Sequence, residues 1–170
     1  MIDGDGRQDA VKSDRPPTNR TAAGEAFSLL VVRILRLNGL LAAAGDALAR
    51  PAGQTTARWQ VLAMLEEGSH TVSETARTLG LARQSVQRVA DLLESEGLVA
   101  YEENPRHRRA RLLRLTMLGR STLGEIQAAQ RPWADGLGGT LGEARLRRLN
   151  ADLERVLDAL AGRARRGPTR

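Results

Sequence analysis

Residues 71–116 read TVSETARTLGLARQSVQRVADLLESEGLVAYEENPRHRRARLLRLT, and this stretch decides the expected fold. It begins with a capping box, in which the side chains of Thr71 and Glu74 accept hydrogen bonds from free backbone N–H groups of the first helical turn. Gly80 can adopt the left-handed conformation that ends a helix sharply. The pattern therefore predicts a short helix up to Gly80 and, after a tight turn, a second helix over about 82–96.

A β-hairpin is expected after the second helix. Segments 98–103 and 110–115 contain apolar and branched residues, and the polar sequence NPRHRR, residues 104–109, lies between them. Turn chemistry between two such segments is typical of a hairpin. Two helices joined by a glycine turn and followed by a hairpin form a winged helix-turn-helix. The side chains expected in the core shared by the two helices are Ala76, Leu81, Val86 and Val89.

The face of the second helix opposite this core carries no apolar side chain. A rotation of about 100° per residue places these residues on or beside it: Arg83, Gln84, Gln87, Arg88, Asp91 and Ser95. Gln and Arg match adenine and guanine edges in the major groove. We therefore expect base contacts from Gln84, Gln87 and Arg88. Arg83 and Ser85 are expected nearer phosphates. The alternative is a solvated amphipathic face.

The hairpin is strongly basic. It contains five arginines and no acid between residues 104 and 114, and four basic side chains cluster at its turn, Arg106, His107, Arg108 and Arg109. An arginine in this position can enter a narrow minor groove, which has enhanced negative potential. Solvated surface charge is the alternative for any one of them. Together with the polar helix face, the cluster favours double-stranded DNA as the partner.

Helices are also expected before the winged helix-turn-helix. The segment from Glu25 to Ala49 is apolar on nearly every face, which is typical of a helix covered on several sides. Thr55 or Thr56 can cap a further helix that runs to Gly68. The first of these segments is a candidate for contact with a second copy of the chain.

The region after Thr116 is expected to form two more helices. Pro132 is expected to kink the first, and the glycine-rich residues 136–142 to separate it from the second. In the second, apolar residues recur at steps of three and four, as in a coiled coil. This seam consists of Leu146, Leu149, Leu153, Val156 and Leu160. Packing within the chain is the alternative, but the winged lobe is small, so a homodimer is expected, with two DNA half-sites about one helical turn apart.

Residues 55–68, TTARWQVLAMLEEG, and the stretch 71–116 resemble the MarR family of bacterial transcriptional regulators. The most specific parts are the RQSVxR sequence of the second helix and the wing, which ends in RRA followed by LxRLT. The resemblance implies a homodimer with interleaved terminal helices that binds a pseudo-palindrome and usually represses transcription. The resemblance also implies that the positions matching the family's DNA contacts bind DNA here; on the second helix these are Arg83, Gln84, Ser85, Gln87 and Arg88. In the wing the matching residue is Arg106, with Arg108 as the alternative and Arg109 beside them.

Two positions depart from the family pattern. Ala82 stands where the family often has a Ser or Thr cap, so a capping hydrogen bond worth about 1 kcal/mol is expected to be absent. Asn104 and His107 replace the two acidic residues that are common in the wing. The wing is therefore more basic, and its arginines lack carboxylates that would orient them.

The resemblance also implies domain boundaries and an effector. It spans residues 21–163, with the winged helix-turn-helix at 55–116 and dimerisation helices at 24–50 and 117–163. Residues 1–20 are expected to be a disordered tail, and residues 164–170 a basic one. Many family members release DNA when an aromatic or phenolic compound binds. Candidates to line such a pocket are Arg33, Arg36, Asn38 and Trp59; a core position is the alternative for Trp59.

Composition excludes several other classes. The chain has 170 residues, a net charge of +6 and no cysteine, so disulfides, thiolate metal sites and thiol switches are excluded. His70 and His107 are too far apart in sequence for a local ligand pair, and neither a metal nor a cofactor is expected. With only four aromatic residues, the chain is a poor candidate for stacking single-stranded nucleic acid. No common catalytic motif is present, so an enzyme is not expected.

Targeting signals are not expected either. Arg33 interrupts the longest apolar run, so no membrane span is predicted, and the N-terminus does not resemble a signal peptide. A cytoplasmic protein is the expectation. Two alternative functions are compatible with the same fold. The chain could be an architectural protein that binds DNA of any sequence, or a winged helix that docks another protein.

Overall fold

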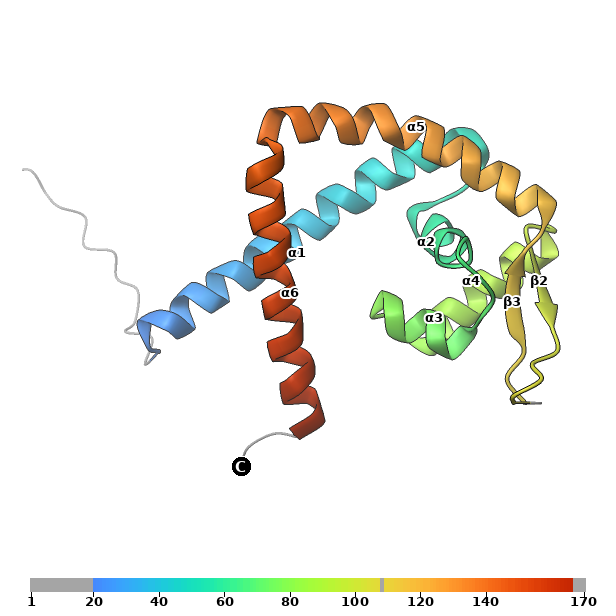
Figure 1. The fold of residues 1–170 in the computed structure, drawn as a ribbon, viewed down its shortest axis with the longest axis horizontal. Helices are drawn as coiled ribbons and strands as arrows, with labels where there is room; N and C mark the ends of the chain where they lie inside the picture. The colour runs from blue at the N-terminus through green and yellow to red at the C-terminus, as the bar shows by residue number, and fades with distance from the viewer. Residues whose placement is uncertain (1–19, 108, 167–170) are drawn as a thin grey trace, which may run out of the picture. The chain divides into compact units, whose positions relative to one another are not determined.

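The computed structural model describes residues 20–107 and 109–166. The fold is mainly helical with a small antiparallel sheet, as predicted (Figure 1). The elements are α1 (Ala22–Ala49), the 3-10 turn η1 (Arg50–Ala52), α2 (Thr56–Met64), β1 (His70–Thr71), α3 (Val72–Leu79), α4 (Arg83–Ser95), β2 (Val99–Glu102), β3 (Leu112–Leu115), α5 (Met117–Leu141) and α6 (Glu143–Arg166). Apart from Arg20 and the end of α6, the predicted tails lie outside the described residues.

The described residues divide into two compact units, one up to Leu40 and one from Leu41 onward. The first contains most of α1, whose large apolar side chains are exposed, for example Leu35 at 66%. The helical segment Ala22–Ala52 is long and apolar enough to cross a membrane, judged by length and composition alone. Arg33 does not interrupt the helix, because α1 continues through this residue without a break. The core helix of a soluble protein passes the same test.

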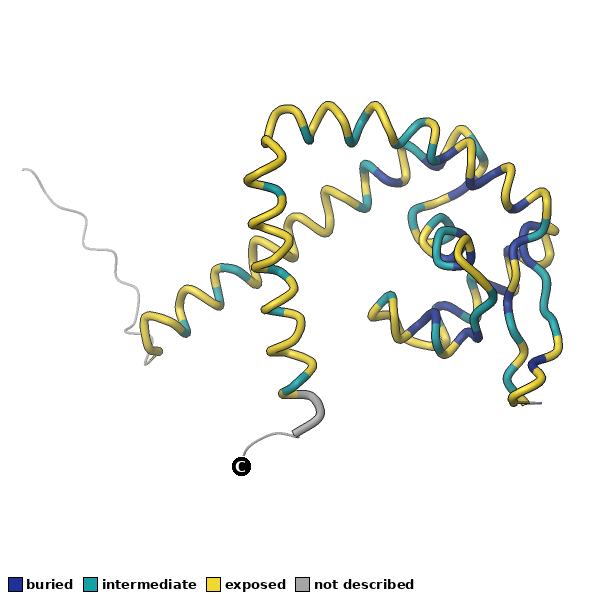
Figure 2. The backbone as a smooth tube through the Cα atoms, viewed as in Figure 1, coloured by how far each residue is buried: buried dark blue, intermediate teal, exposed yellow. Residues whose placement is uncertain are grey.

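The second unit contains the hydrophobic core, which is made by α2, α3, α4, the sheet and the first half of α5 (Figure 2). Ala76 and Val86 are buried, and Val89 packs against the core, as predicted. Leu81 is 43% exposed, contrary to the prediction. It follows Gly80, whose positive φ of 66° turns the chain, so its side chain lies on the outside of the turn.

The sheet has three strands in the order β1-β3-β2, all antiparallel. The predicted hairpin is formed by β2 and β3, with Val99 opposite Leu115 and Glu102 opposite Leu112. The sequence did not predict β1, whose two residues are too few to show an alternating pattern. This strand ties the start of α3 to the wing, because Thr71 pairs with Leu112.

The predicted caps are present. Thr55 and Thr116 cap α2 and α5, and Thr71 and Glu74 form the capping box of α3. The N-cap of α4, Ala82, makes no side-chain capping hydrogen bond, also as predicted.

The predicted break over residues 136–142 is wrong. Helix α5 includes Pro132 and continues to Leu141, and the boundary is Gly142 alone, with φ 81°. The glycines before it are compatible with the helix, because their backbones keep helical hydrogen bonds, such as that from Gly142 N to Gly138 O at 2.9 Å.

Candidate nucleic-acid interface

Helix α4 presents a polar and basic surface that its buried face fixes in orientation. Val86, Ala90 and Leu93 are at most 1% exposed and anchor the helix to the core. Arg83, Gln84 and Arg88 are exposed, whereas Ser85 and Gln87 are half-buried. A surface hollow of about 450 Å³ is lined by Arg83, Gln84, Gln87 and Arg88. The structure thus brings together four of the five residues predicted on this helix.

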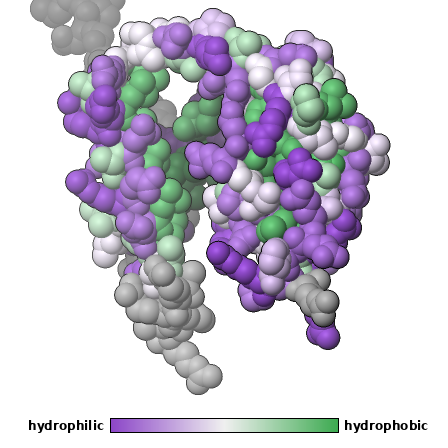
Figure 3. All heavy atoms as spheres, turned by 45° about the vertical axis from the view of Figure 1, so that its right-hand side comes forward, coloured by the Kyte–Doolittle hydropathy of each residue, from purple (hydrophilic) through white to green (hydrophobic). Residues whose placement is uncertain are grey.

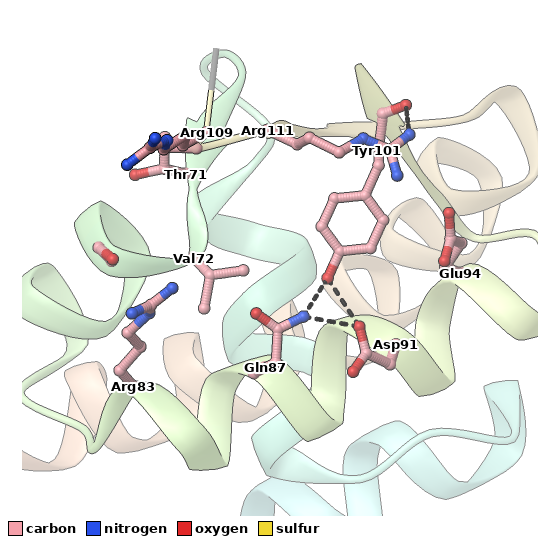
Figure 4. A pocket seen from close by; sticks show the side chains of 11 residues that line it. Thr71, Val72, Arg83, Gln87, Asp91, Glu94, Tyr101, Arg109 and Arg111 are labelled. Carbon is pink, nitrogen blue, oxygen red and sulfur yellow. Dashed lines mark hydrogen bonds between the residues drawn. The ribbon is translucent and has the colours of Figure 1, made fainter. Parts of the chain in front are cut away.

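A hydrogen-bonded cluster links α4 to strand β2 of the wing (Figure 4). Gln87 Nε2 lies 2.7 Å from Asp91 Oδ1 and 2.7 Å from the Tyr101 hydroxyl. The Tyr101 hydroxyl donates to Asp91 Oδ1 at 2.8 Å. Burial and the hydrogen bond to Asp91 raise the pKa of Tyr101 to about 12, so the hydroxyl keeps its proton near neutral pH.

The wing arginines are not equivalent, and the two that were not predicted to contact DNA, Arg111 and Arg114, have partners within the wing. Arg111 lies over the Tyr101 ring, 4.9 Å from its centroid, and donates to the Tyr101 carbonyl oxygen at 2.8 Å. Arg114 pairs with Glu102 on the neighbouring strand. Arg106 and Arg109 are exposed, and their side chains have no ion-pair partner among the residues that the structure describes. Arg108, a predicted DNA contact, lies outside the described residues.

Asn104 organises the turn of the wing. It is only 9% exposed, and its Oδ1 accepts hydrogen bonds from the backbone N–H groups of Arg106 at 3.0 Å and His107 at 3.3 Å. Its Nδ2 donates to Ala110 O at 2.9 Å. An amide can donate and accept at once, which a carboxylate cannot. The side chain that replaces an expected acid therefore holds both ends of the turn.

A second hollow, of about 350 Å³, lies between the start of α3, helix α4 and the wing (Figure 4). Arg83 of α4 and the wing residues Arg109 and Arg111 contribute positive charge to its lining, and Thr71 contributes a polar group. Asp91 and Glu94 line it as well, so the charge is mixed. The hollow connects the polar face of α4 with the basic wing, and this continuous surface can contact a polyanion.

The predicted seam on α6 is not buried within the chain. Leu149 and Leu160 are 50% and 49% exposed, and Leu146, Leu153 and Val156 are half-buried. Figure 3 shows hydrophobic side chains beside hydrophilic ones along the helical column that ends in the grey C-terminal residues. Within one chain the seam therefore lacks a full cover.

An apolar pocket of about 290 Å³ lies in the second unit. Its lining residues come from the end of α1, from α2 and from α5: Leu41, Gly45, Leu48, Thr56, Trp59, Gln60, Ala63 and Trp133. Trp59 lines this pocket and also packs against the hydrophobic core, and its role in binding an effector remains a prediction. Arg33, Arg36 and Asn38 belong to the first unit, are not among the lining residues, and remain a prediction.

Trp133 is the pocket residue that sequence reasoning missed. The sequence contains only two tryptophans, and both line this pocket. The sequence contains no signal that places them together, because they lie on separate helices that only the tertiary fold brings to one pocket. In the described ranges, 20–107 and 109–166, no group of His, Asp and Glu is arranged to hold a metal ion.

Comparisons with known proteins agree with this geometry. A model described as MarR family matches residues 52–110. The uncharacterized protein Rv2011c of Mycobacterium tuberculosis is 38% identical over 136 residues, which cover 80% of this chain and 95% of that protein.

Two solved structures are also similar. NMB1585, a MarR family regulator from Neisseria meningitidis, has 26% identity and a TM-score of 0.66, covering 81% of this chain and 94% of its own. The M. tuberculosis transcriptional regulator MosR, solved in complex with DNA, has 25% identity and a TM-score of 0.64, covering 76% of this chain and 96% of its own.

Proposed function

Because this chain belongs to the MarR family of transcriptional regulators, we propose that it binds a specific pseudo-palindromic DNA operator as a homodimer and represses transcription. MarR family transcription regulators are not enzymes, in agreement with the expectation from the sequence. The observation that carries the proposal is the outward surface of α4, where Arg83, Gln84, Gln87 and Arg88 line one hollow.

The proposed contacts follow from exposure and chemistry. Arg88 and Gln84 are exposed and unpaired among the described residues, and their side chains suit guanine and adenine edges in the major groove. Arg83 and Ser85 contact phosphates on either side. Arg106, held at the turn by Asn104, enters the minor groove.

The experiment is a binding titration with two duplexes, the DNA upstream of the protein's own gene and a scrambled version of it, at two salt concentrations. The proposal expects the native duplex to bind at least about 10³-fold more tightly and both affinities to fall steeply with salt. Equal affinity for the two duplexes would favour an architectural DNA-binding protein. Failure to bind either would favour a winged helix that docks another protein.

A second copy of the chain is the proposed cover for the apolar residues of α1 and α6. The exposed side chains of α1 include Val32 at 61% and Leu40 at 62%, and leaving such surface in water is unfavourable. The seam on α6 has helical spacing that suits a partner helix. A soluble cytoplasmic homodimer therefore accounts for the apolar composition of α1 that would otherwise suit a membrane.

The apolar pocket supports a more specific proposal, that the protein is a repressor that responds to a ligand bound there. Its two tryptophans offer aromatic walls, Gln60 offers a polar group, and no charged side chain lines it, which suits a neutral aromatic or phenolic compound. Because both tryptophans of the chain line the pocket, intrinsic fluorescence reports its occupancy directly. Titration with phenol should change this fluorescence more than titration with benzoate, and saturation should weaken operator binding. Unchanged fluorescence throughout would contradict an effector of this class.

A further inference from the structure

We propose that Gln87 reads its base pair only as a hydrogen-bond acceptor, because Asp91 and Tyr101 hold its amide nitrogen. The inference rests on the proposed function and adds a specificity rule to it. Gln87 thereby differs from Gln84 on the same helix, for which no such hydrogen bonds are found among the described residues.

The orientation of the Gln87 amide is fixed by its neighbours. A carboxylate can only accept hydrogen bonds, so the side of the amide that lies 2.7 Å from Asp91 Oδ1 must be the NH₂ group. With the amide reversed, Gln87 Oε1 would face that carboxylate, and the two oxygens would repel each other.

The donors and acceptors of the cluster are fully matched. Tyr101 donates its only hydroxyl proton to Asp91 and accepts from Gln87 at 2.7 Å. The amide has two N–H groups, one for Asp91 and one for Tyr101. Gln87 therefore has no N–H group left for a base, whereas an unrestrained glutamine can both donate and accept.

The amide oxygen remains available. The described residues supply no hydrogen bond to Gln87 Oε1, and this oxygen points away from Tyr101 and Asp91, toward the side of Arg83 (Figure 4). Gln87 also lines the hollow formed with Arg83, Gln84 and Arg88. Its oxygen thus lies on the surface that is proposed to face DNA.

An acceptor selects bases that offer a donor. In the major groove adenine presents N6–H₂ and cytosine N4–H₂, whereas guanine and thymine present acceptors. Gln87 should therefore favour adenine or cytosine over guanine or thymine on the strand that it faces. It cannot form the bidentate contact that a free glutamine makes with adenine, because that contact needs an N–H donor for adenine N7. Asp91 and Tyr101 act here as positioning residues.

The test is selection from a library of random 24-bp duplexes by the full-length protein, followed by sequencing. The variant Q87A identifies the base pair that Gln87 reads, as the position whose preference disappears. At that position the unchanged protein should favour adenine and cytosine over guanine and thymine by about fivefold, the value of one hydrogen bond.

Two variants then separate the inference from a merely structural role. Asp91→Asn lets the amide turn, so guanine and thymine should become acceptable at this position. Tyr101→Phe frees one N–H group, so adenine should be enriched over cytosine. Glu125→Gln is the control, because it removes one exposed carboxylate from α5, outside both hollows, and it should keep the original preference.

Three outcomes overturn the inference: a preference for guanine or thymine in the unchanged protein, no altered position in Q87A, or an unaltered preference in both D91N and Y101F. If the unchanged protein enriches no sequence at all, the proposed function fails and the inference fails with it. If the inference alone fails, the unchanged protein still selects an operator, but the variants do not change the base preference at the position of Gln87. Thermal unfolding of each variant confirms that the protein tested is folded.

Discussion

Gly119 of α5 lies directly against the carbonyl oxygen of Leu98, at the point where α4 leads into the wing. A Cβ atom at position 119 would lie only 2.0 Å from that oxygen. The same oxygen accepts a hydrogen bond from the backbone N–H of Thr116 at 3.1 Å, and the Thr116 hydroxyl caps α5 by accepting from Gly119 N at 3.0 Å. Helix α5 can therefore approach the wing only because residue 119 has no side chain.

Gly119→Ala is expected to destabilise the protein. Its methyl group meets backbone, which cannot move aside as a flexible side chain can, so α5 must shift. We expect the free energy of unfolding to fall by about 2 kcal/mol or more, measured by urea denaturation. Gly124→Ala is the matched control, because a Cβ there meets nothing within 4 Å in the same helix. It should stabilise the protein by up to about 1 kcal/mol; equal effects would contradict the steric explanation.

The capping box of α3 should make stability depend on acid pH. Glu74 accepts hydrogen bonds from the backbone N–H and the hydroxyl of Thr71, both at 2.8 Å, and these lower its pKa below the ordinary value of 4.5. A lowered pKa in the folded state stabilises the protein above pH 4.5, and this contribution is lost as pH falls through the folded-state pKa.

Glu74→Gln should therefore be less stable than the unchanged protein at pH 7, and the difference should shrink at pH 3.5. Denaturant unfolding at the two pH values measures it. Glu67→Gln removes an exposed carboxylate that forms no hydrogen bond with any described residue, and is the control. A difference for E74Q that stays constant down to pH 3 would contradict the role assigned to this carboxylate.

Features encoded over a few residues could be predicted from the sequence. The capping box of Thr71 and Glu74, the turn at Gly80 and the cap at Thr116 all depend on contacts within four residues, so the local pattern contains the necessary information. The polar face of α4 was predictable for the same reason, since helical geometry alone places Gln84 and Arg88 opposite Val86.

Features made by residues distant in the chain could not be predicted. Gln87 and Tyr101 are 14 positions apart, and nothing local indicates that the tyrosine hydroxyl reaches the helix. Nothing local indicates either that Trp59 and Trp133 line one pocket. At residues 136–142 the glycine content predicted a break that the structure does not have. Helical hydrogen bonds outweighed the weak helix propensity of glycine, and only Gly142 lies outside the helix.

The seam on α6 predicts a dimer that one charge can disrupt. Leu153→Asp places a carboxylate in the centre of the seam, and the two-fold symmetry of a homodimer would introduce it twice. We expect the dissociation constant of the dimer to rise at least about 100-fold, measured by light scattering across a dilution series.

Ala151→Asp is the control for the dimer prediction. It adds the same charge to the same helix, but on the opposite, exposed face, and should leave the dimer intact. An L153D variant that remains as dimeric as A151D would show that the seam does not hold the two chains together.

Arg88 and Arg106 should contribute to DNA binding in different ways. Arg88→Ala removes a base contact, so operator affinity should fall by about 1–3 kcal/mol while affinity for scrambled DNA changes little. Arg106→Ala should weaken binding to both duplexes, and the slope of log affinity against log salt should decrease by about 1 per wing, because its charge acts on DNA of any sequence. Fluorescence anisotropy at several salt concentrations measures both effects. Arg120→Ala, which removes an exposed charge outside both hollows, controls for the loss of positive charge alone. If R88A and R106A behave like R120A, the surface of α4 and the wing is not the DNA-binding surface.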